Sequence, residues 1–275
     1  MINKKTVIFL LIIFVFTASL SLAAQNYPIK YEDELRREIV VEKEVERIIS
    51  LAPGITEIIY ALGLEDKLVA VSSACDYPKE ALKKENVGRI DEPNIEKIVS
   101  LEPDLVIAES VTKIESLKSL TELGIKNIGF KPTSINDTIE MIDDIALLTA
   151  SQKAGDQLTA QMEKDYQKIK KMVAEKLRNN ERKKVFYEIW SDPLYTAGKD
   201  TFIDSLIHDA GGYNIAREAQ GSWPQFSLES LIAADPEVYI SSEHSTPTGL
   251  SLAELREREL YRDISAFKNN RLYLV

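Results

Sequence analysis

The chain has 275 residues, of which 44 are acidic and 34 are basic, and its formal net charge is −10 at pH 7. This balance argues against nucleic-acid binding, because that function depends on basic patches. The length is ample for one large domain or for two lobes of about 100 to 125 residues each.

The first 23 residues have the pattern of a secretory signal peptide. Lys4 and Lys5 precede an apolar run from 6 to 16, and Ser21 and Ala23 are the small residues that precede a cleavage site. The apolar run is shorter than the roughly 18 to 20 residues that cross a membrane. No cysteine lies at the cleavage point. We therefore expect residues 1–23 to be removed and the protein to be periplasmic, without a lipid anchor.

Residues 24–150 are predicted to form an N-terminal lobe. Alternating apolar and polar residues at 27–31 and 39–41 predict a leading hairpin. Pro53 and Gly54 are expected to form a turn. Further strands are predicted at 47–52, 68–71 and 126–130, and helices at 56–62 and 114–123. Strands that alternate with helices predict an α/β lobe with a mostly parallel sheet.

Residues 134–177 have a helical pattern of apolar residues throughout. Ser151 is placed to cap the second of two helices, which would run for about 27 residues and reach roughly 40 Å. This helix could be an ordinary surface crossover. Because it lies between two related halves of the chain, we interpret residues 151–180 as a bridging helix that joins two lobes.

Residues 181–275 are predicted to form a C-terminal lobe. A strand at 184–190, a turn at 191–193 and a helix at 201–210 are followed by Gly211 and Gly212. This order of strand, proline-bearing turn, helix and glycine resembles residues 47–63. The chain ends on an apolar strand at 271–275.

One segment occurs twice, at 94–107 and at 227–240. Each copy has a polar cap, a short amphipathic helix, an acid-Pro-acid stop and a buried strand. Glu96 and Glu229 occupy the same place in the first helical turn, where an acid complements the helix dipole. The dipole does not require this acid in both halves. The two carboxylates could instead meet two basic pockets on a symmetric membrane partner.

Few residues of the chain suggest catalysis. His208 and His244 are isolated in sequence, and with Cys75 they are too few for a usual zinc site. Gly198-Lys199 lacks the upstream glycine of a phosphate loop, and no nucleophile elbow is present. No pair of carboxylates stands out among the 44 acids. The chain is therefore predicted not to be an enzyme, and a secreted hydrolase that uses carboxylates is the alternative.

Large side chains gather in loops that follow strand ends, where ligands usually bind in open α/β sheets. Any single ring could equally belong to the core. As a set, these residues favour a cleft for a large, partly flat or apolar ligand. The candidates for ligand contact are Trp223, Trp190, Ile90, Tyr77, Tyr195 and Pro53.

Five segments together resemble the substrate-binding proteins of ABC importers for cobalamin, iron(III) siderophores and haem. They are residues 47–57, 61–63, 71–78, 94–107 and 222–229, and the likeness extends over nearly all of 27–275. It implies an α/β fold of two lobes with mostly parallel sheets, joined by a single long α-helix. It also implies that the protein holds a corrinoid or iron(III) chelate between its lobes and delivers it to a permease dimer. We further expect a monomer without a resident cofactor or metal.

The resemblance also assigns roles to particular residues. Glu96 and Glu229 match the glutamates that dock in arginine pockets of the permease, and Trp223 matches an aromatic residue that packs on the corrin. Ala74 and Ile90 stand where cobalamin-binding members present a tyrosine and a tryptophan. Family members continue past the strand at 272–275 into a C-terminal helix, so we expect this chain to be truncated at its end.

Overall fold

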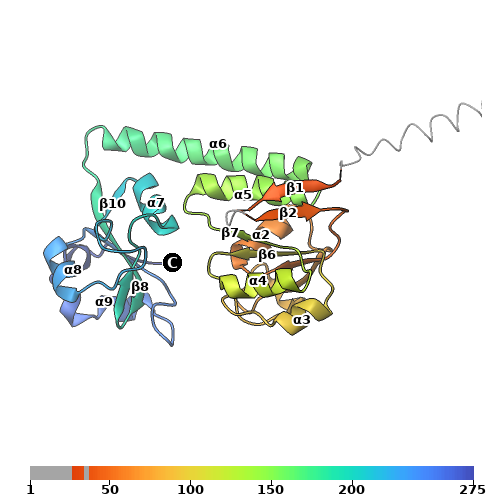
Figure 1. The fold of residues 1–275 in the computed structure, drawn as a ribbon. Helices are drawn as coiled ribbons and strands as arrows, with labels where there is room; N and C mark the ends of the chain where they lie inside the picture. The colour runs from red at the N-terminus through yellow and green to blue at the C-terminus, as the bar shows by residue number, and fades with distance from the viewer. Residues whose placement is uncertain (1–26, 34–36) are drawn as a thin grey trace, which may run out of the picture.

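The computed structural model describes residues 27–33 and 37–275, which form two α/β lobes beneath one long helix (Figure 1). The predicted signal peptide, residues 1–23, lies outside the described residues, and so does the turn of the leading hairpin. Its two strands, β1 (Ile29–Glu32) and β2 (Glu38–Val41), pair antiparallel as predicted.

The sheet of the N-terminal lobe has the order β5-β4-β3-β6-β7, and all its pairings are parallel. Its strands are β3 (Ile48–Ser50), β4 (Leu68–Val71), β5 (Glu85–Asn86), β6 (Leu105–Glu109) and β7 (Asn127–Phe130). The side chains of Ile48 and Ile49 are both fully buried although they point to opposite faces of β3. A parallel sheet buried on both faces explains the continuous apolar runs of these strands.

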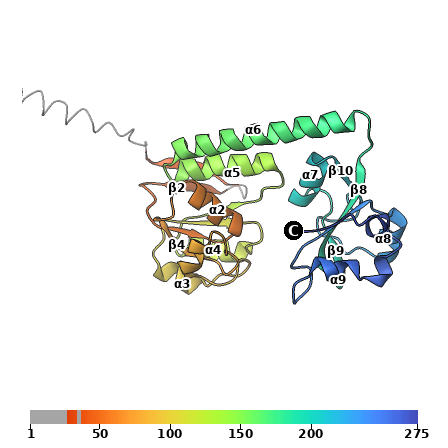
Figure 2. The ribbon, with the colours of Figure 1, turned by 180° about the vertical axis from the view of Figure 1, so that it is seen from behind.

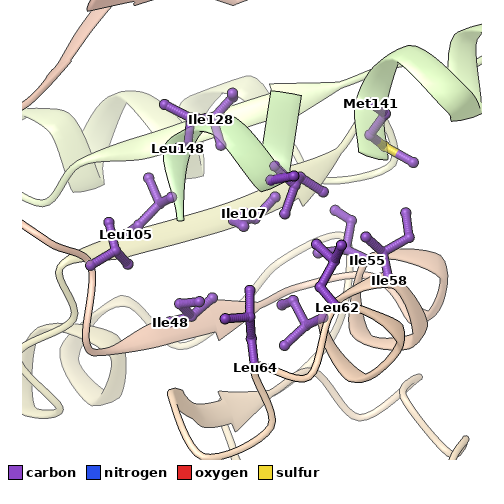
Figure 3. Close-up of a cluster of buried hydrophobic side chains, with 14 of the residues drawn as sticks. Ile48, Ile55, Ile58, Leu62, Leu64, Leu105, Ile107, Ile128, Met141 and Leu148 are labelled. Atoms are coloured by element: carbon purple, nitrogen blue, oxygen red, sulfur yellow. The ribbon is translucent and has the colours of Figure 1, made fainter. Parts of the chain in front are cut away.

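Helices cover both faces of this sheet. Figure 3 shows the larger cluster, in which α2 (Pro53–Ala61) and α5 (Ile135–Leu148) pack against residues such as Ile48 and Ile107. On the opposite face, α3 (Ile95–Ser100) and α4 (Ile114–Glu122) pack against Ile49 and Val106. The short 3-10 helix η1 (Lys79–Lys83) and the two-residue strand β5 were not predicted.

The predicted turn at Pro53 and Gly54 is wrong, because helix α2 begins at Pro53. Proline suits the first position of a helix, since its φ is already helical and the N–H that it lacks would have no partner there. The N–H of Thr56 donates to the carbonyl of Ala52 at 3.0 Å, which closes the first turn. Pro53 therefore lies at the N-terminus of a helix, directly after the end of β3.

Helix α6 (Gln152–Leu177) joins the two lobes, as Figures 1 and 2 both show. Its 26 residues correspond to a length of about 39 Å at 1.5 Å per residue. The predicted capping by Ser151 is wrong. Ser151 occupies the cap position, but its hydroxyl lies 2.9 Å from that of Thr149 and makes no capping hydrogen bond.

At the N-terminal lobe, α6 packs very closely on α5. Gly155 is buried at the contact, and a Cβ at this position would lie 2.5 Å from the Cβ of Ala146. We expect Gly155→Ala to lower the free energy of unfolding by about 1 to 3 kcal/mol, because the two helices must move apart. Urea denaturation measures the loss.

The control for this prediction is Gln157→Ala, at an exposed position of the same helix. Replacing glycine with alanine normally stabilises a helix interior by about 1 kcal/mol. A gain in stability at Gly155 would therefore contradict the close packing.

In the C-terminal lobe, parallel strands lie in the order β10-β8-β11-β12, and β9 pairs antiparallel with β8. The strands are β8 (Lys183–Ser191), β9 (Leu194–Thr196), β10 (Gly212–Asn214), β11 (Val238–Ser241) and β12 (Leu272–Leu274). The helical segments are α7 (Phe202–Asp209), α8 (Leu228–Ala234), α9 (Leu252–Arg256), η2 (Glu259–Tyr261) and α10 (Ser265–Lys268). Phe186 and Tyr239 form the centre of the core of this lobe.

The C-terminal half of α6 is fixed to this lobe through α7. The hydroxyl of Tyr166 donates a hydrogen bond to Asp209 Oδ2 at 2.5 Å. This bond, together with burial, raises the pKa of Tyr166 to about 12. Helix α6 therefore contacts both lobes.

The repeated segment forms the same unit in both lobes. Helices α3 and α8 are followed by Glu102 and Asp235, which have left-handed φ values of 47° and 45°. A proline comes next in each copy, and strands β6 and β11 follow. The predicted relation between the two halves is therefore present in the backbone. Within residues 27–33 and 37–275, no helix has the length and apolar character needed to cross a membrane.

Candidate functional site

A cavity of about 830 Å³ lies at the carboxyl ends of the N-terminal strands. Strand β3 lies between β4 and β6. After β3 the chain forms β4 on one side of it and then crosses to form β6 on the other side. Such a switch point in an open α/β sheet is the usual place for a ligand. The volume falls within the range of small-molecule sites, about 300 to 1,000 Å³.

Four strand ends supply the wall of the cavity that belongs to the N-terminal lobe. These side chains come from the segments that follow the strands, or from the last residue of a strand. The contributions are Pro53, Gly54 and Glu57 after β3, Tyr77 and Pro78 after β4, Glu109 at the end of β6 and Pro132 after β7.

Helices line the other sides of the cavity. Thr138, Met141 and Ile142 come from α5, and Leu158 and Met162 come from α6. Phe202, the first residue of α7, is the contribution of the C-terminal lobe. The cavity therefore lies between the lobes, beneath the bridging helix.

The lining is largely apolar, and the charged residues in it are the acids Glu57 and Glu109. Burial raises the pKa of the Glu109 carboxyl above its usual range. No lysine, arginine or histidine of residues 27–33 and 37–275 belongs to the lining. Across the described part of the chain, no group of three or more His, Cys, Asp or Glu residues is placed to hold a metal ion. The arrangement is suited to enclosing a mainly apolar ligand.

Two of the six predicted ligand contacts line this cavity, namely Pro53 and Tyr77. Tyr77 is 64% exposed, so its ring is available to a ligand. Ile90 instead packs against the core of the N-terminal lobe. The ligand-contacting role of each of these residues stays a prediction.

The other three predicted contacts, Trp190, Tyr195 and Trp223, lie in the C-terminal lobe and do not line the cavity. Trp190 donates its indole N–H to the carbonyl of Asp192 at 2.8 Å. Trp223 is 57% exposed. Its ligand-contacting role is likewise untested.

The segment that carries Trp223 is held against β9 by backbone hydrogen bonds. The N–H of Thr196 donates to the carbonyl of Pro224 at 3.1 Å, and the N–H of Phe226 donates to that of Leu194 at 2.8 Å. Tyr195 and Gln225 form an antiparallel bridge between these bonds. Trp223 is thus an exposed ring beside an ordered piece of backbone.

Glu96 and Glu229 have matching positions on their helices. In α3 the side chain of Asn94 accepts the N–H of Lys97 at 2.9 Å, and in α8 that of Ser227 accepts the N–H of Ser230 at 3.0 Å. Each glutamate is the second residue of a capped helix and is exposed. Neither forms an ion pair with another described residue. In Figures 1 and 2, α3 lies at the end of its lobe away from α6, and α8 lies on the outer side of the other lobe.

Sequence reasoning missed most of the cavity lining. Its members on α5 and α6, such as Ile142 and Leu158, belong to apolar stripes that predict helix packing. Glu109 was also missed, although an acid that ends a buried strand at a sheet edge is a recognisable signal. Phe202 gave no comparable signal, because its position in the cavity depends on the position of the C-terminal lobe relative to the N-terminal lobe.

Residues 48–275 match the model of a family described as periplasmic binding protein. An uncharacterized ABC transporter substrate-binding lipoprotein of Bacillus subtilis is 33% identical over 257 residues, which cover 90% of this chain and 78% of that protein. A vitamin B12-binding protein of Vibrio cholerae is 33% identical over 205 residues, which cover 74% of this chain and 73% of that protein.

Solved structures give the same picture. The periplasmic vitamin B12-binding protein BtuF of Vibrio cholerae matches with a TM-score of 0.70 and 31% identity, over 84% of this chain and 88% of that one. The periplasmic haem-binding protein HutB of Vibrio cholerae matches with a TM-score of 0.70 and 26% identity, over 83% and 89% of the two chains. These matches lie within the family that the motifs resemble.

Proposed function

Because the chain belongs to the family of periplasmic binding proteins, which its residues 48–275 match, we propose that it captures a corrinoid or an iron(III) chelate and delivers it to an ABC transporter permease. The observation that carries this proposal is the apolar cavity of about 830 Å³ between the lobes. Burial of a large, mainly apolar ligand there would provide most of the affinity.

The proposed ligand class rests on the chemistry of the cavity and on the relatives. Proteins named for binding vitamin B12 and haem have the fold of this chain and similar sequences. Both of those ligands are large, flat rings with apolar faces. The cavity walls offer aliphatic and aromatic side chains to such a ring, among them Tyr77, Met162 and Phe202.

The alternative, a secreted hydrolase, has less support. The family consists of binding proteins associated with transport, and none of the relatives named above is described as a hydrolase. In the part of the chain that the structure describes, the cavity is lined by two carboxyls and by no histidine, cysteine or lysine that could act with them. We therefore propose a binding protein that does not catalyse a reaction.

We also propose that residues 1–23 direct export and that the mature protein acts outside the cytoplasm as a monomer. Membership of a periplasmic binding family supports this location. The Bacillus subtilis relative is named a lipoprotein, whereas the sequence predicts a cleavage site without a lipid-anchored cysteine. Mass spectrometry of the exported protein would distinguish a free N-terminus from a lipid-modified one.

The function is tested by mixing the purified protein with cyanocobalamin, haemin or a ferric siderophore. Gel filtration then separates bound from free ligand, and the visible spectrum identifies what co-elutes. We expect one coloured ligand to elute with the protein. If none does, and a panel of hydrolase substrates is turned over, the receptor function is refuted.

For docking, we expect Glu96→Ala and Glu229→Ala together to weaken the complex with the permease while ligand affinity is unchanged. Each substitution removes an exposed carboxylate and with it a charge-assisted contact to an arginine pocket of the permease, which is worth about 1.5 to 3 kcal/mol. Binding to the permease in detergent or nanodiscs at low salt measures the effect.

The double variant should weaken this complex more than either single variant. Glu122→Ala, which removes an exposed glutamate of α4, is the matched control. A complex of unchanged affinity at low salt would refute the docking role of Glu96 and Glu229.

A further inference from the structure

The charged side chains that line the cavity among the described residues are all acidic. Of the residues that the structure describes, Glu57 and Glu109 are the charged members of the cavity lining, and no lysine, arginine or histidine belongs to it. Glu57 is exposed on α2, whereas Glu109 is half buried at the end of β6. Glu109 is therefore the less hydrated of the two carboxyls in the lining.

The carboxyl of Glu109 lies against the start of α2. A Cβ on Gly54 would lie 3.2 Å from Glu109 Oε1, so the absence of a side chain at Gly54 makes room for this carboxyl. Among the described residues, its side chain forms no hydrogen bond and no ion pair. Most of the residues that line the same cavity are apolar, among them Pro53 and Ile58 of α2.

A carboxyl in this environment lowers the stability of the folded protein when it is charged. A half-buried carboxylate without a partner loses hydration, and burial accordingly raises the pKa of Glu109. A carboxyl with a raised pKa favours the folded state when it is protonated, and this contribution is lost as the pH rises through its pKa. The charged form of Glu109 therefore reduces stability.

We infer that Glu109 selects the ligand by charge: the cavity accepts a ligand that presents a positive charge or hydrogen-bond donors to this carboxylate, and it rejects one that presents carboxylates or phenolates. This inference rests on the proposed function. Among the proposed ligands, corrinoids carry amide side chains with N–H donors, and their cobalt centre can be cationic. Haem carries two propionates, and ferric catecholates are anions, so both would place like charge in a poorly hydrated site.

The test compares three probes: aquacobalamin, which is cationic, cyanocobalamin, which is neutral, and haemin, which bears carboxylates. Titration calorimetry gives the affinity of each for the wild type and for Glu109→Gln. Glutamine keeps the shape and removes the charge. Glu122→Gln is the same change at an exposed position outside the cavity, and it should leave all three affinities unchanged.

For the wild type, we expect both corrinoids to bind more tightly than haemin. Glu109→Gln should weaken aquacobalamin by about tenfold, as loss of a charge-assisted contact does, and cyanocobalamin by less. The melting temperature of this variant should be equal to or higher than that of the wild type. Glu109→Lys should reverse the preference toward haemin.

The outcomes separate the two proposals. If the wild type binds haemin as tightly as the corrinoids, or if Glu109→Gln changes no affinity by more than about twofold, charge selection is refuted and the receptor function stands. If the wild type binds none of the three probes and no ferric siderophore, charge selection is refuted together with the proposed ligand class, and turnover of a hydrolase substrate would also refute the receptor function. A large fall in melting temperature for Glu109→Gln would show a structural role and would also overturn the inference.

Discussion

Replacing Arg258 with methionine is expected to lower the free energy of unfolding by about 3 to 5 kcal/mol, because it leaves a buried carboxylate without its counter-charge. The side chain of Glu188 is fully buried in the C-terminal lobe. Arg258 contacts it with both terminal nitrogens, Nη1 at 2.5 Å and Nη2 at 3.0 Å. Urea denaturation followed by circular dichroism measures the loss.

The neighbours of this ion pair show why the loss should be large. Tyr239 and Ser241 of β11 also donate hydrogen bonds to Glu188, which lies on the adjacent strand β8. Burial raises the pKa of Tyr239 well above its usual range, so its hydroxyl stays protonated as a donor. Arg258, which lies between α9 and η2, thus connects a helical segment to two central strands.

A double variant separates the ion pair from simple loss of packing. Glu188→Gln combined with Arg258→Met removes both charges, so it should be more stable than Arg258→Met alone. Arg262→Met, at an arginine side chain that is 77% exposed, is the matched control and should change stability by less than about 0.5 kcal/mol. A loss below about 1 kcal/mol for Arg258→Met would contradict the prediction.

The parts of the fold that were predicted correctly are those with local signals. Strand β4 has the predicted bounds, and α4 begins where predicted and ends one residue earlier. The apolar period and a following glycine mark such elements within a few residues. The repeat also has a local signal, because its proline and neighbouring acids mark the end of the helix before β6 in one lobe and before β11 in the other.

Two of the missed strands depend on distant partners. Strand β9 has three residues and exists through its antiparallel pairing with β8, and β5 has two residues that pair with β4. A strand of two or three residues is too short to show an apolar period of its own. Pro53 was misplaced for a different reason, since proline and glycine together predict a turn, whereas proline also starts helices.

The site was predicted less well than the fold, and the reason is geometric. Tyr77 and Pro53 follow strand ends, so the rule for open sheets identified them. Leu158 and Met162 lie on a helix stripe whose residues serve partly as core and partly as cavity wall. The position of α6 above the strand ends decides which of these residues belong to the core and which line the cavity. The periodic spacing of apolar residues in the sequence does not reveal that position.

Filling the cavity is expected to have the largest effect on ligand binding. Ala61 is exposed at the end of α2 and lines the cavity, so Ala61→Trp should place a large ring in space that the ligand needs. We expect the affinity for the bound coloured ligand to fall by about a hundredfold or more, which is about 2.7 kcal/mol. Because Ala61 is exposed, the melting temperature should change little.

Two further variants show which lobe provides the main contact. Ala160→Trp introduces the same ring at an exposed position of α6 outside the cavity, and it should bind ligand as the wild type does. Trp223→Ala should weaken binding by about 1 to 3 kcal/mol if the predicted stacking on the ligand occurs. If Ala61→Trp binds normally while Trp223→Ala does not, the ligand rests on the aromatic surface beside β9, and the cavity beneath α6 is not the binding site. If both variants are impaired, the ligand extends from the strand ends of the N-terminal lobe to Trp223, as expected for a large ring held between two lobes.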